Sequence, residues 1–293
     1  MSLISLVRTN RSSNLKNHIE KSVDLINFHF NSNIHKVVIK ANMCYYWDYS
    51  IGETTSPLFV SGLIDFLRER LSSPEVYIVE SDASAMKCKH AFRMLGYEKL
   101  ANKKGVNLIN LSKDENKEIK VTTANKSYKF LIPATIKNAD LFINVPKIKY
   151  MAGTLISCAL KNIYGCNPYP QKFKYHSKLD EVIVALNKIM KPDLCLVDGV
   201  IVRGQHTKKL GLIMASEDSV STDSAAAKII GLNPKKIRHI VLAEKEGLGR
   251  IRYKTIGENI EYFAQRFPRK DQIEKIEHAI IKLGVSVLRK ARG

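Results

Sequence analysis

Lysines and amide side chains follow a short buried strand and close a predicted helix near the middle of the chain. Lys147 and Lys149 come directly after the apolar run 141–145. Lys161 and Asn162 lie in the last turn of the helix predicted next. Amines suit phosphate or carboxylate binding, and a lysine removed from water has a lowered pKa that fits it for general base catalysis. The stretch therefore predicts an anion site at a strand-to-helix corner.

Three further predicted strands end in polar side chains of the same kinds. Lys40 and Asn42 close one strand, Asp198 follows another, and Asp218 follows a third. Because ligands of open α/β sheets bind at the carboxyl ends of parallel strands, we expect these groups to share one edge of the sheet. Solvent-exposed lysines are the alternative interpretation.

The candidate acids and bases each have a structural alternative. His176 titrates near neutrality, which suits proton transfer, although a lone histidine is more often structural or a helix cap. Asp198 could bind a metal, a hydroxyl or a lysine, or form a turn with Gly199. Asp218 and Asp223 flank a helix start, where a carboxylate also stabilises the helix dipole.

The elements that must position these groups alternate between strands and helices. We expect helices over 14–28, from Thr55 or Ser56 to about 71, and over 155–163. This order predicts an α/β fold with a largely parallel sheet and helices on both faces, in Rossmann-like layers. Residues 106–132 read as short strands without a helix and predict a small β insertion. The N-terminal residues lack the pattern of a signal peptide and are expected to form a frayed leader, with a transit peptide as the alternative because the segment is poor in acids and carries two arginines.

No clear linker divides the chain, so we expect a single α/β domain over 1–293 with its core at about 37–249. Residues 250–293 form a C-terminal extension with a predicted basic helix at about 272–289.

The composition is strongly basic. Lysine and arginine number 47 against 28 acidic residues, a formal charge of +19. This favours anionic partners: a small anionic ligand, nucleic acid or an acidic membrane face. The chain has no apolar run of about 20 residues that would cross a bilayer. It also lacks a Walker loop and a G-x-G-x-x-G turn.

Cysteine usage indicates reduced thiols and a cytoplasmic protein. The five cysteines form no C-x-x-C pair and no zinc-finger spacing: Cys44, Cys88, Cys158, Cys166 and Cys195. Each is expected to be a buried, inert thiol. A divalent metal stays open, because carboxylates are available at the predicted site.

Several motifs in fixed order resemble the domain of unknown function 362. They are VVIKAN, TTSP, LFINVPKIK, ALKNIYG, YH, LVDG and ASEDSVSTDSAAAKIIGL, between Val37 and Gly249. Members of that family are often linked to a ferredoxin-like iron–sulfur module, whose C-x-x-C-x-x-C-x-x-x-C-P run this chain lacks; an iron–sulfur cluster is therefore not expected. The family's usual second histidine after the lysine pair is Tyr150 here, which weakens a two-histidine mechanism. The resemblance implies these site positions: Lys40, Asn42, Thr55, Pro57, Lys147, Lys149, Lys161, Asn162, Gly165, His176, Asp198, Gly199, Asp218, Asp223 and Gly231.

The resulting hypothesis is an enzyme for a small carboxylate or phosphate substrate that transfers protons as an isomerase or racemase does. Lys161, His176 and Lys149 are the catalytic candidates. The substrate-binding candidates are Lys40, Asn42, Thr55, Lys147, Asn162, Asp198, Asp218 and Asp223. The alternatives are a nucleic-acid-binding protein that uses its basic surface and an iron–sulfur or redox protein.

Overall fold

The computed structural model describes residues 1–9, 15–31, 33–43, 45–151 and 153–269. Its centre is a ten-stranded sheet in which the strands along the main path have the order β12-β1-β11-β10-β7-β2-β3-β4. The strands of this path are β1 (Ser2–Arg8), β2 (Lys36–Ala41), β3 (Glu75–Glu80), β4 (Asn107–Asn110), β7 (Leu141–Val145), β10 (Leu194–Arg203), β11 (Thr207–Ser216) and β12 (Tyr253–Gly257). A hairpin of β8 (Lys147–Met151) and β9 (Leu155–Ser157) also belongs to this sheet, because β8 pairs with β10.

The sheet is largely parallel, as the sequence predicted. Strands β10, β7, β2, β3 and β4 run parallel, and β12 is parallel to β1. The antiparallel pairings are those of β11 with both β1 and β10, and that of β9 with β8. The strands β2 and β7 are almost entirely buried and apolar, which fits a sheet covered on both faces.

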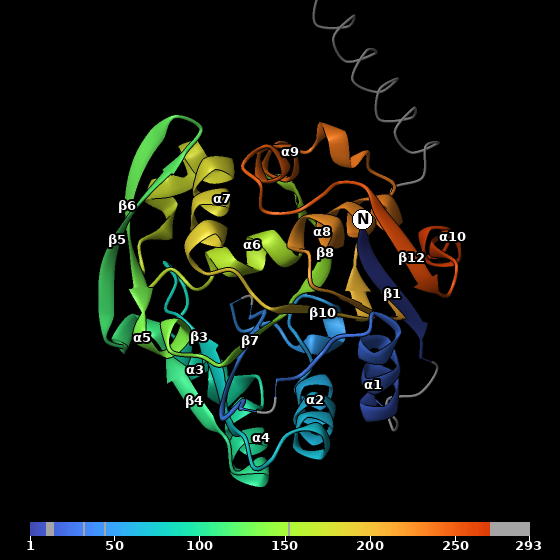
Figure 1. Ribbon diagram of the computed structural model, residues 1–293, viewed down its shortest axis with the longest axis horizontal. Coiled ribbons are helices and arrows are strands. Elements are labelled where there is room, and N and C mark those ends of the chain that lie inside the picture. Colours follow the sequence, from blue (N-terminus) through green and yellow to red (C-terminus); the bar gives the residue numbers. More distant parts are fainter. Residues whose placement is uncertain (10–14, 32, 44, 152, 270–293) are drawn as a thin grey trace, which may run out of the picture.

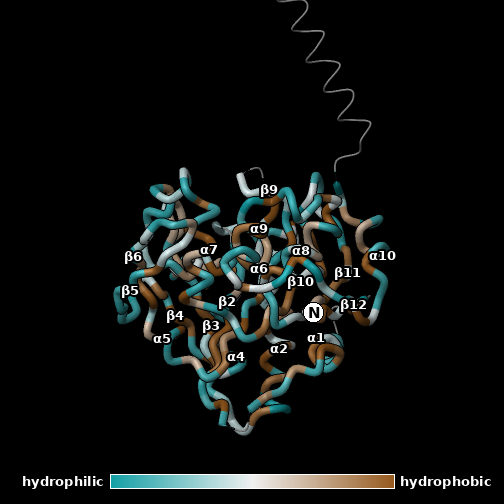
Figure 2. Tube along the Cα trace, turned by 45° about the horizontal axis from the view of Figure 1, so that its top comes forward, coloured by the Kyte–Doolittle hydropathy of each residue, from teal (hydrophilic) through white to brown (hydrophobic). Residues whose placement is uncertain are grey.

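Helices cover both faces of the sheet, which confirms the predicted fold class (Figure 1). One face packs against α1 (Leu15–Leu25), α2 (Pro57–Arg70), α3 (Cys88–Met94) and α4 (Tyr97–Lys104). The other carries α6 (Ala159–Tyr164), α7 (Leu179–Ile189), α8 (Ser219–Ile230) and α9 (Arg238–Lys245). Apolar segments concentrate along the central strands, between these two layers (Figure 2).

The shorter elements complete the chain. They are α5 (Ala134–Lys137), α10 (Ile260–Ala264) and the 3₁₀ turns η2 (Tyr49–Ile51), η3 (Leu111–Lys113), η4 (Lys172–Lys178) and η5 (Pro234–Lys236). The predicted β insertion is present, but its first strand, β4, belongs to the main sheet. The inserted part is the separate hairpin of β5 (Asn116–Thr123) and β6 (Lys126–Pro133), which packs beside α7 (Figure 1).

Two local predictions were wrong. Residues 2–8 form β1 inside the sheet, where their apolar side chains are buried between β11 and β12, so they are no frayed leader. The segment after Pro146 is a β-hairpin rather than a loop, and α6 begins at Ala159 rather than at Leu155.

Strand β12 adds residues 253–257 to the main sheet, and the predicted basic helix at 272–289 lies outside the described residues. No described helix has the length and apolarity needed to cross a membrane.

Candidate functional site

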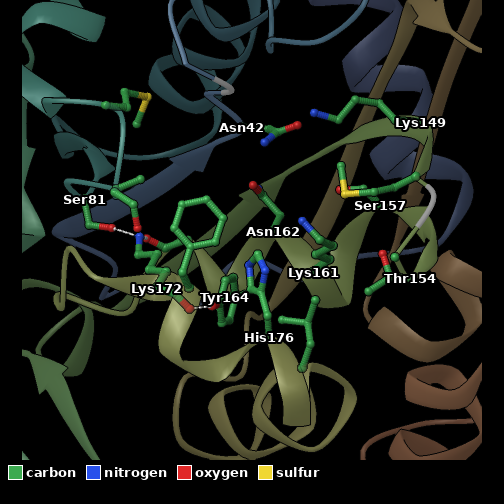
Figure 3. Close-up of a pocket in the computed structure, with 18 of the residues that line it drawn as sticks. Asn42, Ser81, Lys149, Thr154, Ser157, Lys161, Asn162, Tyr164, Lys172 and His176 are labelled. Atoms are coloured by element: carbon green, nitrogen blue, oxygen red, sulfur yellow. Dashed lines mark hydrogen bonds between the residues drawn. The ribbon is translucent and has the colours of Figure 1, made fainter.

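A cavity of about 570 Å³ lies beside the carboxyl ends of β2 and β3 (Figure 3). Its wall comes from these strand ends, the β8–β9 hairpin, α6 and η4. The cationic and imidazole side chains around it are Lys40, Lys149, Lys161, Lys172, His176, Lys178 and Arg238. Carboxylates of Glu80, Asp180 and Glu181 also line it. Cationic groups outnumber acidic ones among these lining residues.

Two of the cavity lysines are buried and ion-paired. Lys40 Nζ lies 2.8 Å from Oε2 of Glu80 and donates a second hydrogen bond, 2.5 Å long, to the carbonyl of Ala41. Lys149 Nζ lies 3.2 Å from Oε2 of Glu53 and donates to the Glu53 carbonyl at 2.9 Å. Each partner compensates part of the cost of burying an ammonium.

Lys172 is a third buried lysine, with neutral hydrogen-bond partners. Its Nζ donates to Ser81 Oγ at 2.5 Å and to the carbonyl of Gly165 at 3.2 Å. The Tyr164 hydroxyl donates to the Lys172 carbonyl at 2.7 Å and so holds the start of η4. Burial lowers the pKa of Lys172 to about 8, with Glu80 opposing this shift and Lys40 adding to it.

The remaining cavity groups differ in burial: Asn162 is buried, Lys161 is half-buried and His176 is exposed. Lys161 and Asn162 extend from α6 (Figure 3). Asn162 Nδ2 donates to Asn144 Oδ1 at 2.7 Å, which fixes the amide. His176 is exposed on η4, and its ring makes an edge contact with Phe173 at 4.8 Å between centroids. An exposed imidazole beside buried amines can exchange protons with solvent.

The cavity therefore brings together six of the eleven catalytic and substrate-binding candidates: Lys40, Asn42, Lys149, Lys161, Asn162 and His176. The other five predicted residues lie elsewhere, within hydrogen-bond networks of the fold: Thr55, Lys147, Asp198, Asp218 and Asp223.

Three of these residues connect strands and helices outside the cavity wall: Thr55, Lys147 and Asp198. Thr55 Oγ1 donates to the carbonyl of Val145 at 2.8 Å. Lys147 Nζ lies 3.1 Å from Asp198 Oδ2, and the same carboxylate oxygen accepts from the amide of Ser56 at 2.9 Å. Of the roles weighed for Asp198, the structure shows lysine binding. Asp198 and Gly199 form no turn, because β10 continues to Arg203.

Asp218 lies at the opposite end of the strands from the cavity, which corrects the prediction that four strand ends converge. Strand β11 is antiparallel to β10, so its last residue, Ser216, pairs with Cys195 near the start of β10. Asp218 caps α8 by accepting from the amides of Val220 and Ser221 at 2.8 and 2.9 Å. Its role is the helix-start alternative.

Asp223 is buried in α8 and accepts a hydrogen bond from the start of α6. Its Oδ1 accepts from the amide of Ala159 at 2.6 Å, at the first residue of α6. Its Oδ2 lies 3.6 Å from Nε2 of His239, which is fully buried. Asp223 thus fixes the start of the helix that carries Lys161 and Asn162.

A model of the family described as "Domain of unknown function (DUF362)" matches residues 37–228. The chain belongs to this family. The match includes every catalytic and substrate-binding candidate and ends within α8, before Gly231.

Two further likenesses are more limited. "Thylakoid-associated protein sll1697" from Synechocystis sp. is 29% identical over 124 residues. The match covers 38% of this chain and 39% of that protein, so it spans less than half of the relative's length. Among solved structures, the lactate racemase apoprotein from Thermoanaerobacterium thermosaccharolyticum has a TM-score of 0.47 and 13% identity, over 78% of this chain and 57% of that one.

Within the DUF362 match, sequence reasoning missed Lys172, Glu80 and Ser81 as cavity residues. Glu80 and Ser81 directly follow the apolar run of β3, so the rule that singled out Lys40 also applied to them. Lys172 carried no such signal, because it begins a 3₁₀ turn after an irregular loop. Its importance comes from burial, which no local pattern predicts.

The described cysteines do not form a metal centre. Cys88, Cys158, Cys166 and Cys195 are buried, and burial raises the pKa of each thiol. In the described part of the chain, no group of three or more His, Cys, Asp or Glu side chains is placed to hold a metal ion. Cys44 lies outside the described residues.

Proposed function

We propose that this DUF362 chain binds a small carboxylate or phosphate compound in the cavity and transfers protons on it, as an isomerase or racemase does. The observation that carries the proposal is the convergence of Lys40, Lys149, Lys161 and Lys172 on one cavity from four separate elements. Amines near a bound carboxylate stabilise the negative charge that develops when a neighbouring carbon loses its proton.

The proposed roles follow from burial. Lys40 and Lys149 are buried and paired, so they serve as fixed positive charges for the substrate anion. Lys161, on α6, and His176, on the exposed turn η4, are the proposed acid and base. Asn42 and Asn162 supply neutral hydrogen bonds to substrate oxygens.

A small ligand fits these observations better than nucleic acid. The groups that carry the proposal line one cavity of a size that suits a small molecule. Nucleic-acid binding would lose affinity steeply with salt, because bound lysines release counterions.

Proton transfer is tested by incubating the protein in D₂O with chiral carboxylates that bear an acidic α-hydrogen, and following deuterium incorporation by NMR. We expect exchange for at least one compound, and a loss of about 10²-fold or more in Lys161→Ala and His176→Ala. Lys236→Ala, at an exposed position on η5, is the matched control and should exchange as the wild type does. Folded Lys161→Ala and His176→Ala proteins with full activity would contradict the assignment.

A further inference from the structure

Lys172 differs from the other buried lysines in the kind of partner it has. The described residues include four buried lysines: Lys40, Lys147, Lys149 and Lys172. Each of the first three has a carboxylate oxygen within 3.2 Å of its Nζ. The hydrogen-bond acceptors of Lys172 in the described chain are a hydroxyl and a backbone carbonyl. Burying an ammonium without a carboxylate partner is costly, so burial shifts the equilibrium of Lys172 toward the neutral amine.

The hydrogen-bond count agrees with a neutral amine. An ammonium has three N–H donors, whereas a neutral amine has two donors and one lone pair. Lys172 Nζ makes two hydrogen bonds, to Ser81 Oγ and to the carbonyl of Gly165. A neutral amine can make both of these hydrogen bonds with its two donors and keep its lone pair available for a reaction.

Burial lowers the pKa of Lys172, and Lys40 acts in the same direction while Glu80 opposes it more strongly than Lys40 adds to it. A Cβ placed on Gly165 would lie 3.1 Å from Lys40 Nζ, so the Lys40 amine packs against the residue whose carbonyl accepts from Lys172. A lysine that is desolvated beside another cationic group loses its proton more easily and becomes a nucleophile. The lowered pKa of Lys172, about 8, is consistent with this arrangement.

We propose that Lys172 is a nucleophilic amine that forms an imine with the carbonyl carbon of an anionic aldehyde or 2-oxo acid held in the cavity. The proposal rests on the proposed function for the binding of the anion and adds the substrate class. The Nζ lone pair attacks the carbonyl carbon, a C–N bond forms, and the carbonyl electrons move to oxygen. The two amine protons end on that oxygen, which leaves as water, so no oxidant or reductant is needed.

An imine at this position would serve the proton transfer proposed above. Once protonated, it withdraws electrons from the neighbouring carbon and makes a hydrogen there more acidic. Lys161 and His176 line the same cavity as Lys172, as Figure 3 shows, and are available to move that proton. Ser81 accepts a hydrogen bond from Lys172 Nζ and holds the amine in place.

The test is reductive trapping with glyoxylate and cyanoborohydride at pH 7, followed by intact mass measurement and peptide mapping. We expect one carboxymethyl group, located on Lys172, at a rate at least about tenfold above that of an exposed lysine. Lys172→Met and Lys172→Arg should lose the fast modification. Lys174→Met, an exposed position in the same turn, is the control and should keep it. Circular dichroism and thermal unfolding establish that each variant is folded.

The outcomes separate this inference from the proposed function. Modification spread over exposed lysines with no excess at Lys172, while calorimetry still shows glyoxylate binding, overturns the imine and leaves the anion site. A neutral probe, glycolaldehyde, should react at least about tenfold more slowly than glyoxylate if the cavity recruits the anion. Equal rates at Lys172 would instead support the reactive amine and contradict the anion site.

Discussion

Lys147 Nζ lies 3.1 Å from Asp198 Oδ2, and both side chains are 1% exposed. The two residues are direct partners in the parallel pairing of β8 with β10. Asp198 also accepts hydrogen bonds from the backbone amides of Ser56 and Val200. The pair therefore joins the β8–β9 hairpin and the start of α2 to the central sheet, below the cavity rather than within it.

Breaking this pair should destabilise the protein strongly. Lys147→Met leaves the Asp198 carboxylate buried without a cation, so we expect the free energy of unfolding to fall by about 3–5 kcal/mol. Lys147→Met combined with Asp198→Asn should recover most of the loss, because no charge is then left alone. Urea unfolding measures both. Lys129→Met breaks an exposed pair with Glu118 and should change little. A Lys147→Met protein as stable as the wild type would refute this role.

The buried histidine behind α6 should make stability depend on pH. Burial alone lowers the pKa of His239, but Asp180 and Asp223 outweigh it and the net pKa lies above the ordinary value of 6.5. Nδ1 lies 3.5 Å from Asp180 and Nε2 lies 3.6 Å from Asp223, while Arg238 approaches Asp180 from the other side at 3.6 Å. Folding thus favours the protonated ring. This stabilisation is present below the unfolded pKa and is lost as pH rises through the folded pKa.

The measurement is the melting temperature of wild type and His239→Gln between about pH 5.5 and pH 8.5. The stability advantage of the wild type should be largest at the acidic end and shrink toward the alkaline end. His29→Gln, at an exposed position, should leave the wild-type profile unchanged. An advantage that grows with pH would show that His239 is buried in its neutral form.

The described cysteines should be unreactive in the folded protein. Thiolate is the nucleophile, and burial raises the pKa of Cys166 and Cys195 to about 12. In a Cys44→Ser background, maleimide at pH 7 should label the native protein negligibly and should label all four remaining thiols after unfolding in guanidinium. Mass spectrometry counts the labels. Fast labelling of Cys88 or Cys166, which lie near Lys40 and Lys172, would revive a thiol role at the cavity.

Local signals in the sequence were enough for much of the fold. Ser56 caps α2 with Pro57 at its first position, and Pro146 separates β7 from β8. The strand-end rule placed Lys40 at the cavity. Each of these features depends on neighbours in the chain, which a sequence pattern can show.

What failed depends on contacts between distant residues. Lys147 and Lys149 alternate with Ile148, a strand pattern, but two lysines in it suggest an exposed loop. They are buried because Asp198 and Glu53 pair with them from other elements. Asp218 was misplaced because an apolar run does not reveal the direction of its strand.

The last prediction concerns the charges around Lys172. Glu80 raises the pKa of Lys172 more than Lys40 lowers it. Replacing one of them alone would leave the other charge buried without its partner, so we consider the pair Lys40→Met with Glu80→Gln. The double variant removes both the raising effect of Glu80 and the smaller lowering effect of Lys40. The pKa of Lys172 should therefore fall below its wild-type value of about 8.

The rate of glyoxylate trapping at saturating probe should reflect this change directly. In the wild type it should rise with pH to a plateau whose midpoint is near the pKa of Lys172, since only the neutral amine attacks. In the double variant the midpoint should move to lower pH, even though binding of the anion weakens with the loss of Lys40. Lys174→Met should leave the midpoint in place. A midpoint that moves to higher pH would mean that Lys40, rather than Glu80, dominates the electrostatics of the reactive amine.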